Sequence, residues 1–278
     1  MLNLWIAPID RIDEARPVTA VTDRNLGPWM VWMHDDRHVV FFREAAGDEN
    51  WRAWRVDLQT GGVRVLTPGP GVTCYIQQRS RHFPSELLTA HNARDKRYFD
   101  VYRVNVATGE SALLQLNDGL VGHFTDQQFR VRFARRHTDD GDVEYLQRGT
   151  DGEWALFSRI GAEDNRSTRP IEFSADGREL YWLDSRGRDT AAVVAQDLES
   201  GMVRVLAKDP PCRFHPAFAR SDQRAPGCRR ACIQARRVAG PGPGLSGRSR
   251  LTRAAIARRS DDHQYVARPA ALDRRVSI

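Results

Sequence analysis

The segment Trp54-Arg55-Val56-Asp57-Leu58-Gln59-Thr60-Gly61 decides the fold, because its turn recurs along the chain. The other copies are Pro8-Ile9-Asp10, Asn105-Val106-Ala107-Thr108-Gly109, Thr150-Asp151-Gly152 and Asp197-Leu198-Glu199-Ser200-Gly201. From one copy to the next, the Asp or Asn residues are 47, 48, 46 and 46 positions apart. An Asp or Asn before Thr-Gly or Ser-Gly supplies the side-chain hydrogen bonds and the positive φ of a tight hairpin. A period of about forty to fifty residues is typical of four-stranded propeller blades.

Short apolar or alternating runs fill each period, a pattern that favours strands over helices. The runs lie at 29–33, 39–42, 51–56 and 63–66, then 74–77, 87–90, 101–106 and 112–116, then 129–133, 143–146 and 154–160, then 171–173, 180–183, 191–197 and 203–207. Before them, 4–8 and 17–21 are expected to form only the outer two strands of a blade. The sequence therefore predicts an all-β fold, an incomplete β-propeller of about four and a half four-stranded antiparallel blades.

Charge divides the 278 residues into two segments. Residues 210–278 hold 15 Arg, no Lys, no Glu and four Asp, a net charge of +11, which leaves −5 of the total +6 for residues 1–209. The turn motif does not recur after Lys208, and the run Gly240-Pro241-Gly242-Pro243-Gly244 cannot form a central strand. We therefore expect a partial propeller domain at 1–209 and a basic tail at 210–278 that is mostly disordered.

The tail raises two further hypotheses. Its Arg-, Ala-, Pro- and Gly-rich composition begins abruptly at a blade border, as a GC-rich gene read in a shifted frame would produce, so the tail is expected to be a frameshift product. Basic clusters also bind nucleic acid through phosphate contacts. Because the tail lacks interleaved aromatic residues for base stacking, we expect no specific nucleic-acid binding.

Cysteine and histidine patterns predict no metal or cofactor. Cys228 and Cys232, with Cys212, His215 and His263, have zinc-like spacing for one pair, but no second pair follows. The sparse cysteines favour a reducing compartment. Surface or turn positions are expected for the remaining histidines, which are His34, His38, His82, His91, His123 and His137.

The apolar start of the chain is too short for a secretory signal, because four charged residues follow directly after Ile9. Apolar runs also stay well below the roughly 18–20 residues of a membrane helix. These two observations predict a cytoplasmic protein without membrane contact.

Charged connections between the second and third strands of the blades provide the candidate functional residues. These connections are Arg43–Asn50, Asn92–Tyr98 and Asp184–Thr190. Propeller function usually resides on the loops of one face. Asp48, Glu49, Arg186 and Arg188 are therefore predicted to line a rim that meets another domain or a ligand, and solvated loops without a partner are the alternative.

Several stretches resemble the propeller of the prolyl oligopeptidase family, near its dipeptidyl-aminopeptidase and acylaminoacyl-peptidase branch. The stretches are Asn3-Leu4-Trp5-Ile6-Ala7-Pro8, Gly47-Asp48-Glu49-Asn50-Trp51, Trp54–Gly61, Asp100-Val101-Tyr102-Arg103-Val104, Phe173-Ser174-Ala175-Asp176-Gly177-Arg178 and Leu183–Ala191. Glu49-Asn50-Trp51 and Ser185-Arg186-Gly187-Arg188-Asp189-Thr190 are the most specific of these. The resemblance covers about residues 2–209.

The resemblance implies a propeller that covers an α/β-hydrolase domain and selects the peptides that reach it. Catalysis in such enzymes needs a Gly-x-Ser-x-Gly elbow followed by Asp and His. Gly244-Leu245-Ser246-Gly247 lacks the second spacing, and the 32 residues from Gly247 to the end, with Asp261, Asp262, His263 and Asp273, are too few for the sheet that would orient a triad. We therefore predict no catalytic residues and a catalytically inactive chain.

Two other functions remain open at this stage. A stand-alone propeller like TolB would bind a protein or peptide partner, and an intact peptidase would need a working Ser246. Partners are expected to be peptides or the hydrolase domain of a parent protein. Because an unclosed propeller presents bare strand edges, aggregation or pairing through those edges is also expected.

Overall fold

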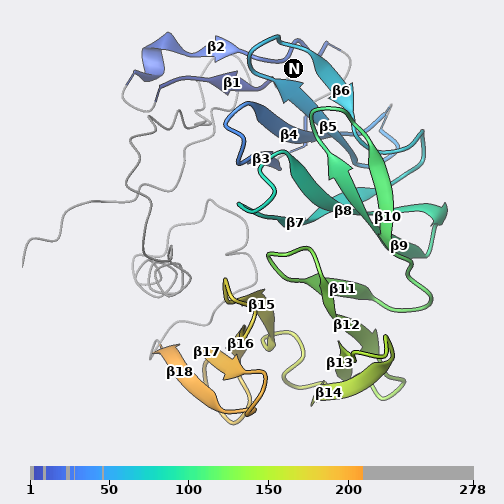
Figure 1. Cartoon of the computed structure of the whole chain (residues 1–278), viewed down its shortest axis with the longest axis vertical. Helices are drawn as coiled ribbons and strands as arrows, with labels where there is room; N and C mark the ends of the chain where they lie inside the picture. Colours follow the sequence, from blue (N-terminus) through green and yellow to red (C-terminus); the bar gives the residue numbers. More distant parts are fainter. Residues whose placement is uncertain (1–2, 9–10, 23–25, 28, 46, 209–278) are drawn as a thin grey trace, which may run out of the picture. The chain divides into compact units, whose positions relative to one another are not determined.

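The computed structural model describes residues 3–8, 11–22, 26–27, 29–45 and 47–208. These residues fall into two compact units, the first ending at Asp118 and the second beginning at Gly119. Apart from a three-residue 3-10 helix, Ile12–Glu14, all regular elements of the described chain are β-strands (Figure 1). The first turn copy, at Ile9 and Asp10, and the whole tail lie outside the described residues.

The first unit contains one two-stranded sheet and two four-stranded sheets. The two-stranded sheet pairs β1 (Trp5–Ile6) with β2 (Arg16–Pro17). The first blade is β3 (Met30–Trp32), β4 (His38–Arg43), β5 (Arg52–Asp57) and β6 (Val63–Val65). The second blade is β7 (Cys74–Arg79), β8 (Glu86–Asp95), β9 (Tyr98–Asn105) and β10 (Ser111–Gln115).

The second unit contains the other two four-stranded sheets. The third blade is β11 (Gly122–Thr125), β12 (Val131–His137), β13 (Val143–Arg148) and β14 (Trp154–Ile160). The fourth blade is β15 (Arg169–Phe173), β16 (Glu179–Asp184), β17 (Ala192–Asp197) and β18 (Val203–Lys208). In all four blades each strand pairs antiparallel with its chain neighbours, which is the meander of a propeller blade. The predicted fold class is confirmed.

Three expectations about strand positions were wrong. Strand β11 was not predicted, because its sequence Gly-His-Phe-Thr lacks alternating apolar residues. The expected strand at 129–133 begins instead at Val131, since Phe129 occupies a turn with φ 62°. The connection Asn92–Tyr98 is mostly strand, because β8 continues to Asp95, which pairs directly with Tyr98.

Alternating residues of each blade fill the core on both faces of its sheet. On β4, Phe42 packs with Ala53 of the same blade and with Leu87 of the next blade. Its neighbour Phe41 packs with Val56 on the opposite face of the sheet. In the second unit, Phe133 of the third blade packs with Trp182 of the fourth. Because sheets with two buried faces show continuous apolar runs, the sequence of β4 has an unbroken apolar run at 39–42.

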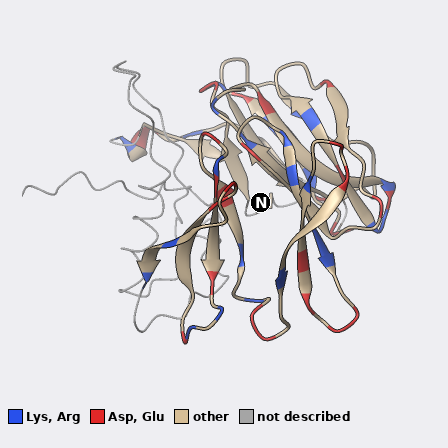
Figure 2. Cartoon of the chain, turned by 60° about the horizontal axis from the view of Figure 1, so that its bottom comes forward, with Lys and Arg blue, Asp and Glu red and all other residues tan. Residues whose placement is uncertain are grey.

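The recurrent turn joins the third and fourth strands of every blade. The Asp57 carboxylate accepts hydrogen bonds from the backbone N–H groups of Gln59 (3.0 Å) and Thr60 (3.4 Å), and Gly61 adopts φ 72°. The equivalent contacts recur at Asn105 and Asp197, followed by Gly109 and Gly201 at φ 77° and 72°. A side chain that accepts from the N–H groups two and three residues further on, before a residue with positive φ, explains this sequence preference. Figure 2 shows acidic and basic residues at the ends of several hairpins.

Arginines of one sheet bind the turn carbonyls of the next. In the first unit, Arg55 Nη2 donates to Ala107 O (3.4 Å), and Arg64 donates to Thr108 O. In the second unit, Arg132 Nη1 donates to Gly177 O (3.3 Å). Since a carbonyl at the end of a hairpin has no strand partner, these contacts satisfy a backbone acceptor and fix neighbouring blades to one another.

The expectation of surface histidines is wrong for three of them. His38, His91 and His123 are at most 4% exposed. His38 Nδ1 lies 2.6 Å from Asp35 Oδ2, and His91 stacks on Tyr102 with ring centroids 4.0 Å apart. In the part of the chain that the structure describes, no helix has the length and apolar character needed to cross a membrane.

Candidate functional site

The connection between β4 and β5 holds the predicted rim residues Asp48 and Glu49, both of which are exposed. Asp48 Oδ1 accepts from the backbone N–H groups of Ala45 (3.1 Å) and Asn50 (3.1 Å). These contacts outweigh the opposing effect of partial desolvation and lower the pKa of Asp48. Glu49 adopts φ 55°, and its backbone N–H donates to the Glu44 carboxylate (3.0 Å). The loop is therefore held by local hydrogen bonds, with its acidic side chains directed to solvent.

The connection between β16 and β17 holds the other two rim residues, Arg186 and Arg188. Both contact one buried carboxylate, that of Asp184, at 2.9 Å and 3.3 Å. Burial tends to raise the pKa of Asp184, but the hydrogen bonds from Arg186 lower it overall. The Arg186 guanidinium also lies 5.9 Å from the centre of the Trp182 ring. These arginines stabilise their own loop, and both side chains remain partly accessible.

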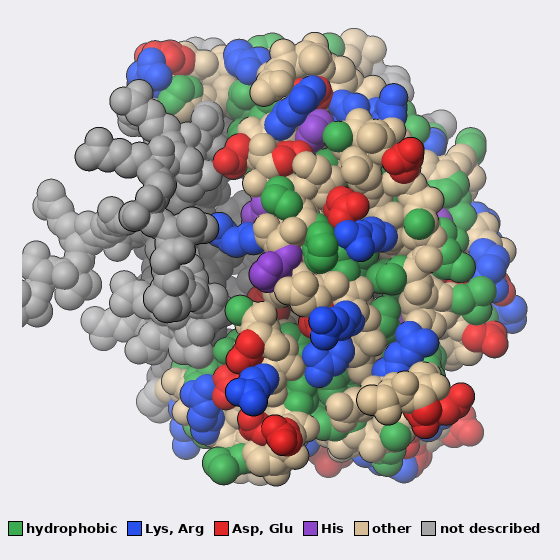
Figure 3. Space-filling view, viewed as in Figure 1, with side chains coloured by type: hydrophobic (Ala, Val, Ile, Leu, Met, Phe, Trp, Pro, Cys, Tyr) green, Lys and Arg blue, Asp and Glu red, His purple; other side chains and the backbone are tan. Residues whose placement is uncertain are grey.

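The four predicted rim residues occupy equivalent connections, each between the second and third strands of a blade. Asp48 and Glu49 belong to the first unit, and Arg186 and Arg188 belong to the second. The structure therefore describes two separate loops, one acidic at its exposed end and one basic. Figure 3 shows basic and acidic side chains interspersed on the face in view.

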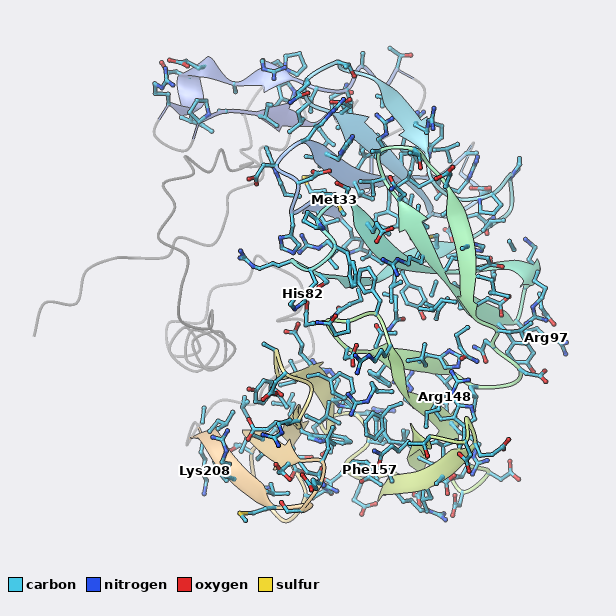
Figure 4. All side chains as sticks on the ribbon, in the orientation of Figure 1. Met33, His82, Arg97, Arg148, Phe157 and Lys208 are labelled. Carbon is cyan, nitrogen blue, oxygen red and sulfur yellow. The ribbon has the colours of Figure 1, made fainter. Side chains whose placement is uncertain are left out.

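Strands β8 and β9 are joined by an ion-pair cluster that the sequence analysis missed. Arg94 forms two hydrogen bonds with the fully buried Asp100, at 2.8 Å and 3.0 Å, and a third with Asn117 O at 2.7 Å. Burial opposes ionisation of Asp100, yet the bonds from Arg94 and from the Asn117 backbone lower its pKa. The cluster fixes the chain directly after β10. Arg97, labelled in Figure 4, lies at the adjacent turn and pairs with Asp95.

Neither of two cavities in the described chain includes the four predicted residues. One, of about 460 Å³, lies in the first unit and is lined by Arg16–Val21, Phe41, Arg43, Asp57, Leu58, Gly61 and Val63. The other, of about 440 Å³, lies in the second unit and is lined by Arg132, Gln147, Gly177, Arg178, Asp197, Leu198 and Glu199. The first combines apolar and basic walls, whereas the second is mostly polar.

Metal and nucleophile chemistry find little support in the described residues. No group of three or more His, Cys, Asp or Glu side chains there is arranged to hold a metal ion. Cys74 is buried, and burial raises the pKa of its thiol well above its usual range, which makes it a poor nucleophile. The residues considered for zinc and for catalysis, Cys212, Cys228, Cys232 and Ser246 among them, lie outside the described residues.

Four-stranded meanders joined at this turn define β-propeller blades. Comparison with known proteins confirms the sequence resemblance to a peptidase of the prolyl oligopeptidase type. Over 210 residues the chain is 37% identical to dipeptidyl aminopeptidase BIII of Pseudoxanthomonas mexicana, a match that covers 75% of this chain and 30% of that protein. The chain thus spans less than a third of the length of this relative. No protein-family model matches the sequence.

Solved structures resemble the chain at low identity and low TM-score. Oligopeptidase B from Trypanosoma brucei is 13% identical with a TM-score of 0.43, over 73% of this chain and 30% of that one. TolB from Agrobacterium tumefaciens is 14% identical with a TM-score of 0.46, over 74% of this chain and 70% of that one. At these scores neither similarity carries an argument about function.

Proposed function

We propose that this chain is the substrate-gating propeller of a dipeptidyl-aminopeptidase-type serine peptidase and that it has no peptidase activity of its own. The observation that carries the proposal is the 37% identity to dipeptidyl aminopeptidase BIII over 210 residues, in a chain whose described part forms four-stranded propeller blades. A closed or partly closed ring of blades restricts access to a site by size and charge, and needs no reactive side chains of its own.

The chemistry of the described residues agrees with a binding role. Two buried acidic residues, Asp57 and Asp100, form ion pairs with Arg37 and Arg94. Ser185, in the most specific stretch of the resemblance, hydrogen-bonds to Asp164, Ser167 and Thr168 rather than to a histidine. This cluster therefore lacks the histidine that activates the serine of a Ser-His-Asp triad.

Within this proposal the exposed rim residues Asp48 and Glu49 contact the hydrolase domain or the incoming peptide. A dipeptidyl aminopeptidase recognises a free N-terminal ammonium group, for which exposed carboxylates are suitable partners. Arg186 and Arg188 would contribute the opposite charge at their own loop, with Asp184 fixing their positions.

A hydrolysis assay on the purified full-length chain tests the proposal. Dipeptidyl and acylaminoacyl nitroanilides should be cleaved no faster in the presence of the chain than in buffer alone. Treatment with a serine-directed phosphonate should label no residue, and Ser246→Ala should change nothing. Cleavage that the phosphonate abolishes, or that Ser246→Ala removes, would show instead that the chain is a peptidase in its own right.

A further inference from the structure

The outer edge of the second blade carries a run of exposed apolar side chains. Strand β10 ends the order of its sheet, so among the described strands of that sheet only β9 pairs with it. Leu113 is 52% exposed, Leu114 is 38% exposed, and Leu116, directly after the strand, is 42% exposed. An edge strand presents backbone N–H and C=O groups that can pair with a strand of another chain. The edge at β10 therefore offers a partner both backbone and apolar groups.

The fourth strands of the other blades differ from β10 in charge. Arg64 lies on β6, Arg159 on β14, and Arg204 and Lys208 on β18. Strand β10, with the sequence Ser-Ala-Leu-Leu-Gln, has neither a charged residue nor a proline. Charged side chains on an edge strand oppose its pairing with another strand, and so do bulges. A shift of register of the kind that a bulge produces occurs at β10, β14 and β18 alike, so only the missing charge distinguishes β10.

A further blade would not cover this edge. Neighbouring blades pack face to face, as Phe42 of the first blade and Leu87 of the second do. The outer edge of a blade therefore stays at the perimeter even in a complete ring, where it is usually short and protected. It is distinct from the sheet faces that an incomplete ring leaves bare. A strand that pairs with β10 would come from another molecule.

A second copy of the chain supplies a matching strand. When two copies of β10 pair antiparallel about a two-fold axis at Leu113, this residue faces its own counterpart, and Ala112 faces Leu114. Glu110, the acidic residue just before the strand, is then opposite Leu116. The two copies of Glu110 lie about 20 Å apart along the pair, well beyond the Debye length of about 8 Å at physiological salt. The strand is therefore complementary to itself.

The interface is small, and its ends are acidic. Stable dimers bury about 1,200–2,000 Å² of surface, which is more than two five-residue strands provide. We therefore expect weak association, with a Kd on the order of 0.1 mM. Glu110 of one copy and Asp118 of the other come to the same end of the pair, and both are exposed. Because salt screens this repulsion, high salt should favour the association.

We propose that the chain forms a weak homodimer through β10, in which two copies of the strand pair antiparallel about a two-fold axis at Leu113. The pairing joins the second blades of the two copies into one continuous sheet. This inference depends only on the first unit and holds whether or not the proposed peptidase relationship is correct.

Sedimentation velocity of the full-length chain tests the inference. The solution should contain about 0.5 M NaCl, which shortens the Debye length to about 4 Å. The wild type should then shift from monomer toward dimer as its concentration rises from about 10 µM to about 500 µM, a range that brackets the expected Kd. Pairing about a two-fold axis closes at two copies. A monomer at every concentration, or continued growth beyond the dimer, would overturn the proposal.

Two lysine variants test the register of the pair. Leu113→Lys should abolish the dimer, because it places two ammonium groups face to face at the axis. Leu116→Lys should weaken the dimer less, since its ammonium group meets Glu110 of the other copy. Equal loss in the two variants would contradict the antiparallel pair centred on Leu113.

The matched control locates the interface. Leu156 is 59% exposed on β14, the equivalent strand of the third blade, so Leu156→Lys should dimerise as the wild type does. Melting curves identify any variant that is unfolded. Leu113→Thr, which keeps a strand-forming residue, should weaken the dimer about tenfold and replaces Leu113→Lys if that variant does not fold. If the folded Leu113 variants dimerise as the wild type does, or if Leu156→Lys also abolishes the dimer, the interface is not β10.

Discussion

The β4–β5 and β16–β17 connections occupy the same place in their blades but are held by different forces. In the first, backbone N–H groups donate to exposed acidic side chains such as Asp48. In the second, two arginines contact the buried carboxylate of Asp184. The difference indicates that the blade scaffold fixes where a loop emerges, while the loop sequence decides whether its charges face solvent or stabilise the fold.

The largest loss of stability is expected from removing the buried carboxylate that holds the β16–β17 connection. Asp184→Asn should lower the free energy of unfolding by about 2–3 kcal/mol, because it leaves two arginines without their buried partner, and their partial exposure limits the loss. Urea denaturation measures the effect. Arg186→Gln, which leaves Arg188 on the carboxylate, should cost less. A loss for Asp184→Asn below that of Arg186→Gln would contradict the role given to the buried carboxylate.

The turn glycines sharpen the comparison within one unit. Gly109→Ala should lower the free energy of unfolding by about 2 kcal/mol, because φ is 77° and the new Cβ would lie 3.0 Å from Arg64 Cδ. Gly61→Ala should lower it by only about 1 kcal/mol, since φ is 72° but no atom lies within 4 Å of the new Cβ. Thermal and urea unfolding of the two variants give the values. Equal losses would show that Arg64 moves aside freely.

A pH effect is expected in the first unit from His91. Burial lowers the pKa of His91 below its usual 6.5, against the attraction of Asp100, so the unfolded chain binds the proton more tightly than the folded one. The folded state should therefore lose stability as the pH falls below about 6.5. His91→Phe keeps the stacking on Tyr102 and should reduce this loss. His82 is exposed (Figure 4), so His82→Phe is the control. If the free energy of unfolding depends on pH in the same way in the wild type and in His91→Phe, His91 is excluded as the cause.

The smallest effect is expected at the exposed loop. Asp48→Asn should leave the free energy of unfolding almost unchanged, because its contacts are solvent-exposed. Glu49→Gln should change stability less still, so a partner-binding defect in either variant could be assigned to contact rather than to folding. A loss for Asp48→Asn comparable to that for Asp184→Asn would remove the distinction between the two loops.

Sequence reasoning succeeded where the signal was local and failed where it was not. The turns at Asp57, Asn105 and Asp197 carry their own capping residues, so they fixed the blade count and the order of the strands. Strand β11 was missed because its burial depends on neighbouring strands rather than on its own composition. No periodicity reveals contacts such as Arg55 to Ala107, which join residues 52 positions apart.

The candidate site shows the same limit. The positions of Asp48, Glu49, Arg186 and Arg188 on loops were predictable, because charged residues lay between two strand runs. That Asp184 contacts both arginines depends on its burial at the end of β16, which the charge pattern does not show. The cavity beside Phe41 was likewise invisible, since it depends on how residues 16–21 pack on the first blade.

Hydrogen exchange measured by mass spectrometry on the full-length chain tests the blade assignment most directly. The amides of the second strands, β4, β8, β12 and β16, lie inside their sheets and should exchange slowest, whereas those of the fourth strands, β6, β10, β14 and β18, should exchange faster. This pattern should repeat in all four blades at the period of the turns. Slow exchange in the outermost strands with fast exchange in the second strands, or uniformly fast exchange across any blade, would contradict the account.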